Sequence, residues 1–179
     1  VEELLASCPD GDCSFATAGV TQYAQERSYW CGPAMLKSLV GVRGVSISQS
    51  TAANRLGTTT AGTDWYNGSY SPVEYALDYY LGPYGANYVP VNLPGSPTST
   101  QKSQFQSRLT ANTNGNWGIA GDAWEVPGGP HLVGHPDWTI FHWFAIRGYL
   151  DWGARTNYAD PASGAGSLSW GNQVPRYSN

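Results

Sequence analysis

Cys31 stands at a position that suits a reactive thiol. Residues 31–40, CGPAMLKSLV, predict a helix because Pro33 fits its first turn and apolar residues then recur at helical spacing. The unpaired N–H groups and the dipole at a helix N-terminus favour an anion, so they lower the pKa of a thiol placed there. Gly32 leaves room for a substrate backbone. The pattern predicts that Cys31 is a nucleophile for acyl chemistry, with a buried core cysteine as the alternative.

Such a nucleophile also needs hydrogen-bond donors for the oxyanion. Gln25 precedes Cys31 by six residues, so its side-chain amide can reach across a short turn to the backbone N–H of Cys31. Gln22 is the competing candidate, three residues further away. We expect Gln25 to complete an oxyanion hole, against the alternative that it is a solvent-exposed surface glutamine.

His142 is the candidate base among three histidines. It lies within IFHWFAIRGY, the most apolar and strand-like stretch of the chain, and a two-residue period places it on one face with Phe144 and Ile146. A buried imidazole needs a partner, either a backbone group, as in a core histidine, or an acid that holds its tautomer. His131 and His135 lie in PGGPHLVGHPD, where glycine and proline predict an exposed hairpin loop.

Asp160 is the candidate acid. A turn around residues 150–153 would fold TNYADP back beside the histidine strand, with Asp160 at the end of the returning strand and before Pro161. Asn157 is the alternative orienting residue, and Asp151 is assigned to the turn. The order Gln, Cys, His, Asp predicts a triad with an oxyanion glutamine.

These side chains need a helix that carries the thiol and strands that carry the base and the acid. Further helices are predicted near residues 48–56, over 72–81, where Ser71 caps and Glu74 completes a capping box, and more weakly over 100–109. Beyond residue 115, β-branched and aromatic residues between turns predict antiparallel strands. Helices followed by a sheet indicate an α+β fold.

Length and composition narrow the class of protein. The 179 residues suffice for one core, so we expect a single domain over 1–179, in which residues 1–20 wrap the surface. Net charge is −4 and no basic stripe exists, which argues against nucleic acid as a partner. No apolar run reaches the length of a membrane span. We expect a monomer without cofactor or metal ion.

Few charges and many turn-forming and aromatic residues are typical of an extracellular domain. Because the chain opens with Val-Glu-Glu and not with a signal-peptide pattern, we expect the processed form of a secreted protein. Cys8 and Cys13 bracket CPDGDC and are expected to close a small disulfide loop, which leaves Cys31 free. Pairing of Cys31 with one of them is the alternative.

Three blocks of the chain carry a family resemblance: QERSYWCGPAMLKSLV, IFHWFAIRGY and YADPASG. They resemble the papain-fold, double-glycine (bacteriocin-processing) peptidase-like family, in the form of its stand-alone extracellular members. The intervening residues 44–114 match by order and length and not by motif.

The resemblance implies a papain-like fold, with the nucleophile on a helical half and the base and acid on a sheet half. It assigns Cys31 as nucleophile, His142 as base, Asp160 as orienting acid and Gln25 as oxyanion glutamine. It further implies a cysteine peptidase. We expect a peptide or protein substrate, with a cell-wall peptide as one alternative, and do not transfer the family's substrate class. Residues 121–138 depart from the pattern, because they are longer and richer in Gly, Pro and His than a plain strand connection. They could form one wall of the cleft.

Other functions fit parts of the same pattern. A Cys-His-Asp set also serves acyltransferases of transglutaminase type, where an amine replaces water. Eight Trp and twelve Tyr could form a non-catalytic platform for glycans or a partner protein. A metal site could use His131, His135 and Asp137, with His142, although glycine and proline interrupt the helix that an i, i+4 histidine pair needs.

Overall fold

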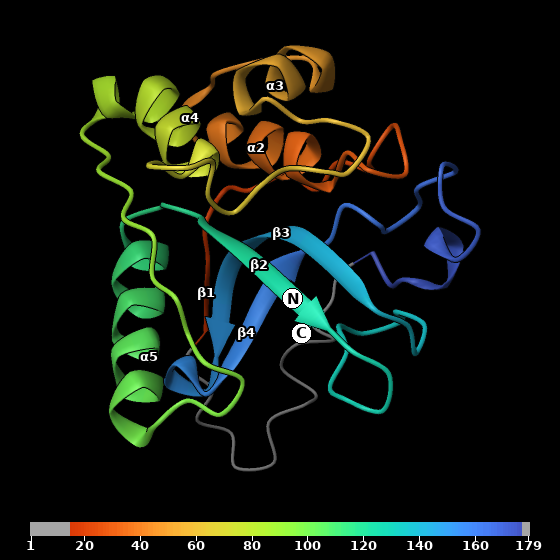
Figure 1. Cartoon of the computed structure of the whole chain (residues 1–179). Helices are drawn as coiled ribbons and strands as arrows, with labels where there is room; N and C mark the ends of the chain where they lie inside the picture. Colours follow the sequence, from red (N-terminus) through yellow and green to blue (C-terminus); the bar gives the residue numbers. More distant parts are fainter. Residues whose placement is uncertain (1–14, 177–179) are drawn as a thin grey trace.

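The computed structural model describes residues 15–176. A short strand, β1, precedes four helices: α2 (Cys31–Val40), α3 (Gln49–Leu56), α4 (Pro72–Leu81) and α5 (Ser99–Asn114), with β1 at Ala16–Thr17. Three strands follow: β2 (Ile119–Glu125), β3 (Ile140–Leu150) and β4 (Arg155–Ala159). Single 3₁₀ turns lie at η1 (Gly41–Arg43), η2 (Gly82–Tyr84), η3 (Asp151–Gly153) and η4 (Gly171–Gln173). This order confirms the predicted α+β arrangement (Figure 1).

β3 is the central strand of an antiparallel sheet. β2 pairs with it from Ile119↔Ile146 to Glu125↔Ile140, and β4 pairs with it from Ala145↔Ala159 to Leu150↔Arg155. The turn η3 joins β3 directly to β4, as the turn predicted around residues 150–153 requires. The end of β4 is thereby brought beside the first half of β3.

α2 is the central helix of the core. Every residue of it except Lys37 is buried, because α3 and α4 pack on one side and β3 on the other (Figure 1). A helix covered all round must be apolar all round, which explains its composition. Its Met35, Leu36 and Leu39 join Leu77 of α4 and Trp143 of β3 in one hydrophobic cluster.

α5 packs against the sheet with a second, smaller cluster, in which Leu109 meets Ile146, Tyr149 and Tyr158. The helix is longer than the weak helix predicted over 100–109. A full capping box explains its early start, because Thr98 and Gln101 each bond the other's backbone N–H. Within residues 15–176, no helix is both long and apolar enough to cross a bilayer.

The predicted starts of α3 and α4 are confirmed. Ser48 Oγ accepts a hydrogen bond from the backbone N–H of Thr51 at 3.0 Å, and Ser71 Oγ accepts one from that of Glu74 at 3.4 Å. Each cap satisfies an N–H that the helix itself leaves unpaired.

Residues 15–20 are the only described part of the segment predicted to wrap the surface, and they do not simply do so. Ala16 pairs with Tyr149, and Ala18 and Val20 are each only 5% exposed. Small apolar side chains here find space at the edge of the core, which the lack of a sequence period concealed. Cys8, Cys13 and their predicted disulfide lie outside the described residues.

The loop between α3 and α4 closes over the first turn of α2. Trp143 Nε1 donates to the carbonyl oxygen of Thr63 at 3.0 Å, and Thr63 Oγ1 bonds Thr58 Oγ1 at 2.7 Å. A Cβ atom added to Gly32 would lie 2.7 Å from Thr63 Cβ. The space that Gly32 leaves is therefore filled by the chain's own Thr63, and not kept for a substrate as the sequence indicated.

We predict that Gly32→Ala destabilises the protein by roughly 1–3 kcal/mol, because the new methyl group overpacks this contact. Gly41→Ala is the matched control at the other end of α2, since nothing lies within 4 Å of its added Cβ. It should change the free energy of unfolding by less than about 1 kcal/mol. Urea unfolding of both variants tests this, and equal effects would contradict it.

Candidate active site

Cys31 is the first residue of α2, as predicted. Trp30 supplies no side-chain cap there, and the backbone groups of Gly32 and Trp143 hydrogen bond to the thiol instead. Cys31 is free and only 7% exposed. The predicted position at a helix N-terminus is therefore confirmed, and within the described residues Cys31 is a free thiol.

His142 lies between the thiol and an acid. One ring nitrogen, Nε2, lies 2.7 Å from Asp160 Oδ1, and the imidazole is close enough to the Cys31 thiol for each group to shift the pKa of the other. With Nε2 engaged by the carboxylate, Nδ1 is the nitrogen that is left for the thiol. Asp160 follows the last residue of β4, and its Oδ1 also accepts from the backbone N–H of Ala162 at 2.8 Å. The structure thus brings together the three residues predicted from the sequence.

The charges of Cys31, His142 and Asp160 stabilise one another. Burial raises the pKa of Cys31, but the hydrogen bond and charge of His142 outweigh it, so the thiol pKa falls below its ordinary value. Burial lowers the pKa of His142, yet Asp160 and Cys31 raise it to about 10. Burial also raises the pKa of Asp160, but His142 and His135 hold it well below the usual range. The arrangement favours a thiolate–imidazolium pair backed by a carboxylate.

Gln25 is buried, at 3% exposure, and not on the surface. Its Nε2 donates one hydrogen to the carbonyl oxygen of Arg27 at 2.8 Å, which fixes the amide orientation because a reversed amide would place two oxygens together. Among the described residues, the second amide hydrogen of Gln25 has no hydrogen-bond partner, and neither does the buried oxygen Oε1. The backbone of Gln25 bonds Pro161 and Ser167, so it is fastened beside the acid-bearing turn.

The alternative residues have other partners. Gln22 Nε2 donates to the carbonyl oxygens of Asp160 and Ser163 at 3.0 and 3.1 Å, so it braces the acid's backbone. Asn157 Oδ1 accepts from Arg147 Nε at 2.9 Å. Asp151 lies in η3, where it pairs with Arg155. Within residues 15–176, the side chain that holds His142 Nε2 is that of Asp160, and not that of Asn157.

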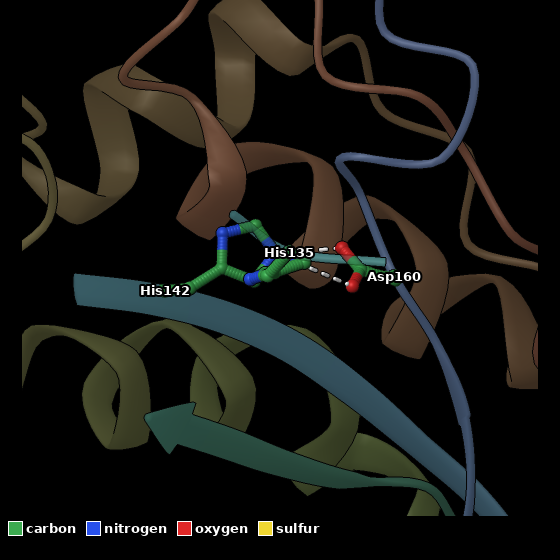
Figure 2. A group of neighbouring side chains, drawn as sticks. All are labelled: His135, His142 and Asp160. Carbon is green, nitrogen blue, oxygen red and sulfur yellow. Dashed lines mark hydrogen bonds and ion pairs between the residues drawn. The ribbon is translucent and has the colours of Figure 1, made fainter. Parts of the chain in front are cut away.

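The prediction that His135 lies exposed in a hairpin loop is wrong. Its side chain is fully enclosed, with Nδ1 lying 2.9 Å from Glu125 Oε2. Its Nε2 lies 2.9 Å from Asp160 Oδ2 (Figure 2). Glu125, the last residue of β2, is 3% exposed. Glycine and proline in the loop indicated turns correctly, but turn signals do not say which side chain folds inward.

The metal set considered from the sequence is not assembled. His131 hydrogen bonds the carbonyl oxygens of Gly129 and Trp138, and Asp137 accepts from the N–H of Gly128, so both organise the loop itself. In the described residues, the donor atoms of His135, His142 and Asp160 do lie within 4.8 Å of one another. Because each of these imidazoles already bonds a carboxylate oxygen, the three fit hydrogen bonding as they stand.

An acid and two exposed aromatic rings lie on β2 and β3, on the face of the sheet opposite to that of His142. Asp122 pairs with Trp143, and Trp124 with Phe141, so alternation places all four on one sheet face. Trp124 and Phe141 are stacked and are 72% and 69% exposed. Neighbouring side chains partly desolvate the Asp122 carboxyl and raise its pKa, while the charge of His142 lowers it; because Asp122 is exposed, solvent screens both effects.

The comparison with known families agrees with this geometry. A family model described as the Peptidase_C39 like family matches residues 17–173. The chain belongs to this family. The match confirms the papain-like α+β fold and extends over residues 44–114, where the sequence blocks matched only by order. Membership in the Peptidase_C39 like family points to a peptidase of the cysteine type. Among curated proteins and among solved structures, no significant match was found.

We predict rapid alkylation of Cys31 by iodoacetamide at pH 6, where an ordinary thiol is well under about 1% ionised. The lowered thiol pKa depends chiefly on His142, so His142→Ala should slow the reaction at least about tenfold. Peptide mapping after timed quenching gives the rate at Cys31. An inert Cys31, or equal rates in both proteins, would contradict the thiolate assignment.

We predict that Asp160→Asn destabilises the protein by roughly 3–5 kcal/mol, because two buried imidazoles lose their shared anion. The pKa of Asp160 is depressed in the folded state, so its contribution is fully present above about pH 4 and is lost as pH falls. Asp151→Asn is the control: Asp151 is a half-exposed acid that pairs with Arg155 at the surface, and its substitution should change stability by under about 0.5 kcal/mol. Urea unfolding between pH 3 and 7 tests both.

Proposed function

We propose that this member of the Peptidase_C39 like family is a secreted cysteine peptidase that hydrolyses peptide or isopeptide bonds. Cys31 is the nucleophile, His142 the base and Asp160 the acid that orients it. Support comes above all from the buried 2.7 Å contact between His142 and Asp160, which leaves one ring nitrogen for the thiol. The extracellular location is inferred from the low content of charged residues, 12% of the chain.

The reaction follows from these positions. The Cys31 thiolate attacks the carbonyl carbon, and the imidazolium of His142 gives its proton to the departing amine as the C–N bond breaks. A thioester on Cys31 results. Neutral His142 then takes a proton from water, whose oxygen attacks the thioester, and the thiolate leaves as the acid product forms. Asp160 keeps the imidazole in one orientation throughout.

Gln25 is proposed to stabilise the negative oxygen of each tetrahedral intermediate. It has one amide hydrogen to give, because only the other is engaged by Arg27. The backbone N–H of Cys31 is the expected second donor, since the first N–H groups of a helix have no partner within it. Gln49 holds this region from α3, through bonds to the backbones of Ala24 and Glu26.

The same charges predict the pH range of activity. As pH falls, the Cys31 thiolate is protonated and attack stops. As pH rises through about 10, His142 loses the proton that the leaving amine needs. The lowered pKa of Cys31 and the raised pKa of His142 together leave a broad window between these limits.

The exposed aromatic pair on the sheet is the main feature that would favour a non-catalytic platform. Trp124 and Phe141 are stacked and exposed, with Asp122 on the same face, whereas strand alternation turns His142 to the opposite face. A non-catalytic aromatic platform would not need a free cysteine thiol beside a buried imidazole.

Hydrolysis of a fluorogenic peptide library tests the proposal. Cys31→Ser should reduce turnover at least about 10³-fold, because a neutral serine hydroxyl is a far weaker nucleophile than a thiolate. Acid quenching of the wild-type reaction should show an acyl adduct on Cys31 by mass spectrometry.

Water as the acceptor is tested by adding a primary amine. Products that are chiefly acids support a peptidase, whereas amide products would assign an acyltransferase. Turnover that survives Cys31→Ser, or activity with Cys31 in a disulfide, would overturn the assignment of Cys31 as nucleophile. No turnover together with an inert Cys31 would favour a non-catalytic binding module.

A further inference from the structure

His135 has a carboxylate at each ring nitrogen. Asp160 Oδ2 lies 2.9 Å from Nε2, and Glu125 Oε2 lies 2.9 Å from Nδ1. A neutral imidazole has one N–H, so only an imidazolium donates to both acids. Burial alone would lower the pKa of His135, but Asp160 and Glu125 outweigh it and raise the pKa. The pKa of Glu125 is lowered in turn, chiefly because the bond from His135 outweighs burial.

The groups around this imidazolium form an alternating row of charges. The ring centre of His135 lies 4.9 Å from that of His142 (Figure 2). His142 carries the same positive charge and contacts the other oxygen of Asp160, Oδ1. Trp170 covers another side, with ring centres 4.8 Å apart. Glu125 also accepts from the N–H of Leu132 at 2.8 Å and is influenced by the charge of His131.

Stability alone is a poor explanation for this arrangement. Burying an ion pair removes two charges from water, and apolar residues of similar size often give equal or greater stability. His135 and Glu125 have side chains that are 0% and 3% exposed, at the end of a loop that could have been closed by apolar packing. Their contact with the second oxygen of Asp160 indicates a use in the active site.

We propose that His135 and Glu125 are positioning residues, which hold the free oxygen of Asp160 so that the carboxylate keeps the orientation required by His142. This inference rests on the proposed peptidase function. Oδ1 of Asp160 serves His142 and Ala162, and without a bond to Oδ2 the carboxylate can rotate about its Cβ–Cγ bond. The bond from His135 stops that rotation, and Glu125 keeps His135 charged and in place.

Two substitutions of His135 separate its two bonds. An asparagine amide nitrogen takes the place of Nδ1, so His135→Asn keeps a donor to Glu125 and loses the one to Asp160. A glutamine amide nitrogen takes the place of Nε2, so His135→Gln keeps the donor to Asp160. Both remove the same charge. We expect kcat for the peptide substrate to fall at least about tenfold in His135→Asn with KM within about twofold, and to recover largely in His135→Gln.

Glu125→Gln tests the charge with little change of shape. The glutamine oxygen still accepts from Leu132, and its amide donates to His135 Nδ1, which leaves a neutral His135 that still donates to Asp160. Asp160 is then less neutralised, so the Cys31 thiolate is disfavoured. The acid limb of the iodoacetamide rate should move to higher pH, with the urea midpoint near the wild-type value.

Asp137→Asn is the control for the loop, because Asp137 is exposed, accepts from the backbone N–H of Gly128 and lies 3.8 Å from His131 Nε2, both within the same loop. It should leave kcat and the pH profile unchanged. Equal activity of His135→Asn and His135→Gln, together with a wild-type pH profile in Glu125→Gln, would overturn the proposal. The rate of Cys31 alkylation should follow the same order among the variants, and it is measured without a peptide substrate. Failure to cleave any peptide would therefore contradict the proposed function alone. Equal alkylation rates of Cys31 in all variants would contradict this inference.

Discussion

The contact between His142 and Asp160 is the interaction on which the site depends. Both residues are nearly inaccessible, at 3% and 1% exposure, and the atoms that join them are 2.7 Å apart. A buried ion without a partner costs several kcal/mol, roughly, so each keeps its charge because the other is present. The thiolate of Cys31 depends on the imidazolium in the same way. The ionic state of the centre therefore belongs to the group of residues and not to any single one.

That contact follows from strand register. β4 returns along β3 so that Ala159 faces Ala145, and the next residue, Asp160, leaves the sheet toward His142. The segment before α2 is fastened to the same turn, through bonds from Gln22 to Asp160 and from Gln25 to Pro161. The helical half that carries the thiol is thus tied to the sheet half at the point where the chemistry needs accuracy. A shift of one residue in either strand would turn the side chains to the other face.

The loop between β2 and β3 shows where local reasoning stops. Its glycines and prolines predicted turns and exposure, and most of its backbone does lie at the surface. His135 nevertheless points inward, because two acids, one of them 25 residues further along the chain, surround the space that it fills. The departure from a plain strand connection was visible in the sequence, yet its purpose was not.

Helical spacing, Ser71 as a cap, and the strand character of β3 act over a few residues, so the sequence by itself determined these elements and their order. It also determined Cys31, His142, Asp160 and Gln25 as candidates, because few side chains offer the necessary chemistry and a helix start is readable locally. Only the tertiary structure decided that Thr63 fills the space beside Gly32, that Gln22 braces the acid, and that His135 and Glu125 lie behind it. Each of these depends on contacts between residues far apart in the chain, and packing around a shared buried charge leaves no local signal.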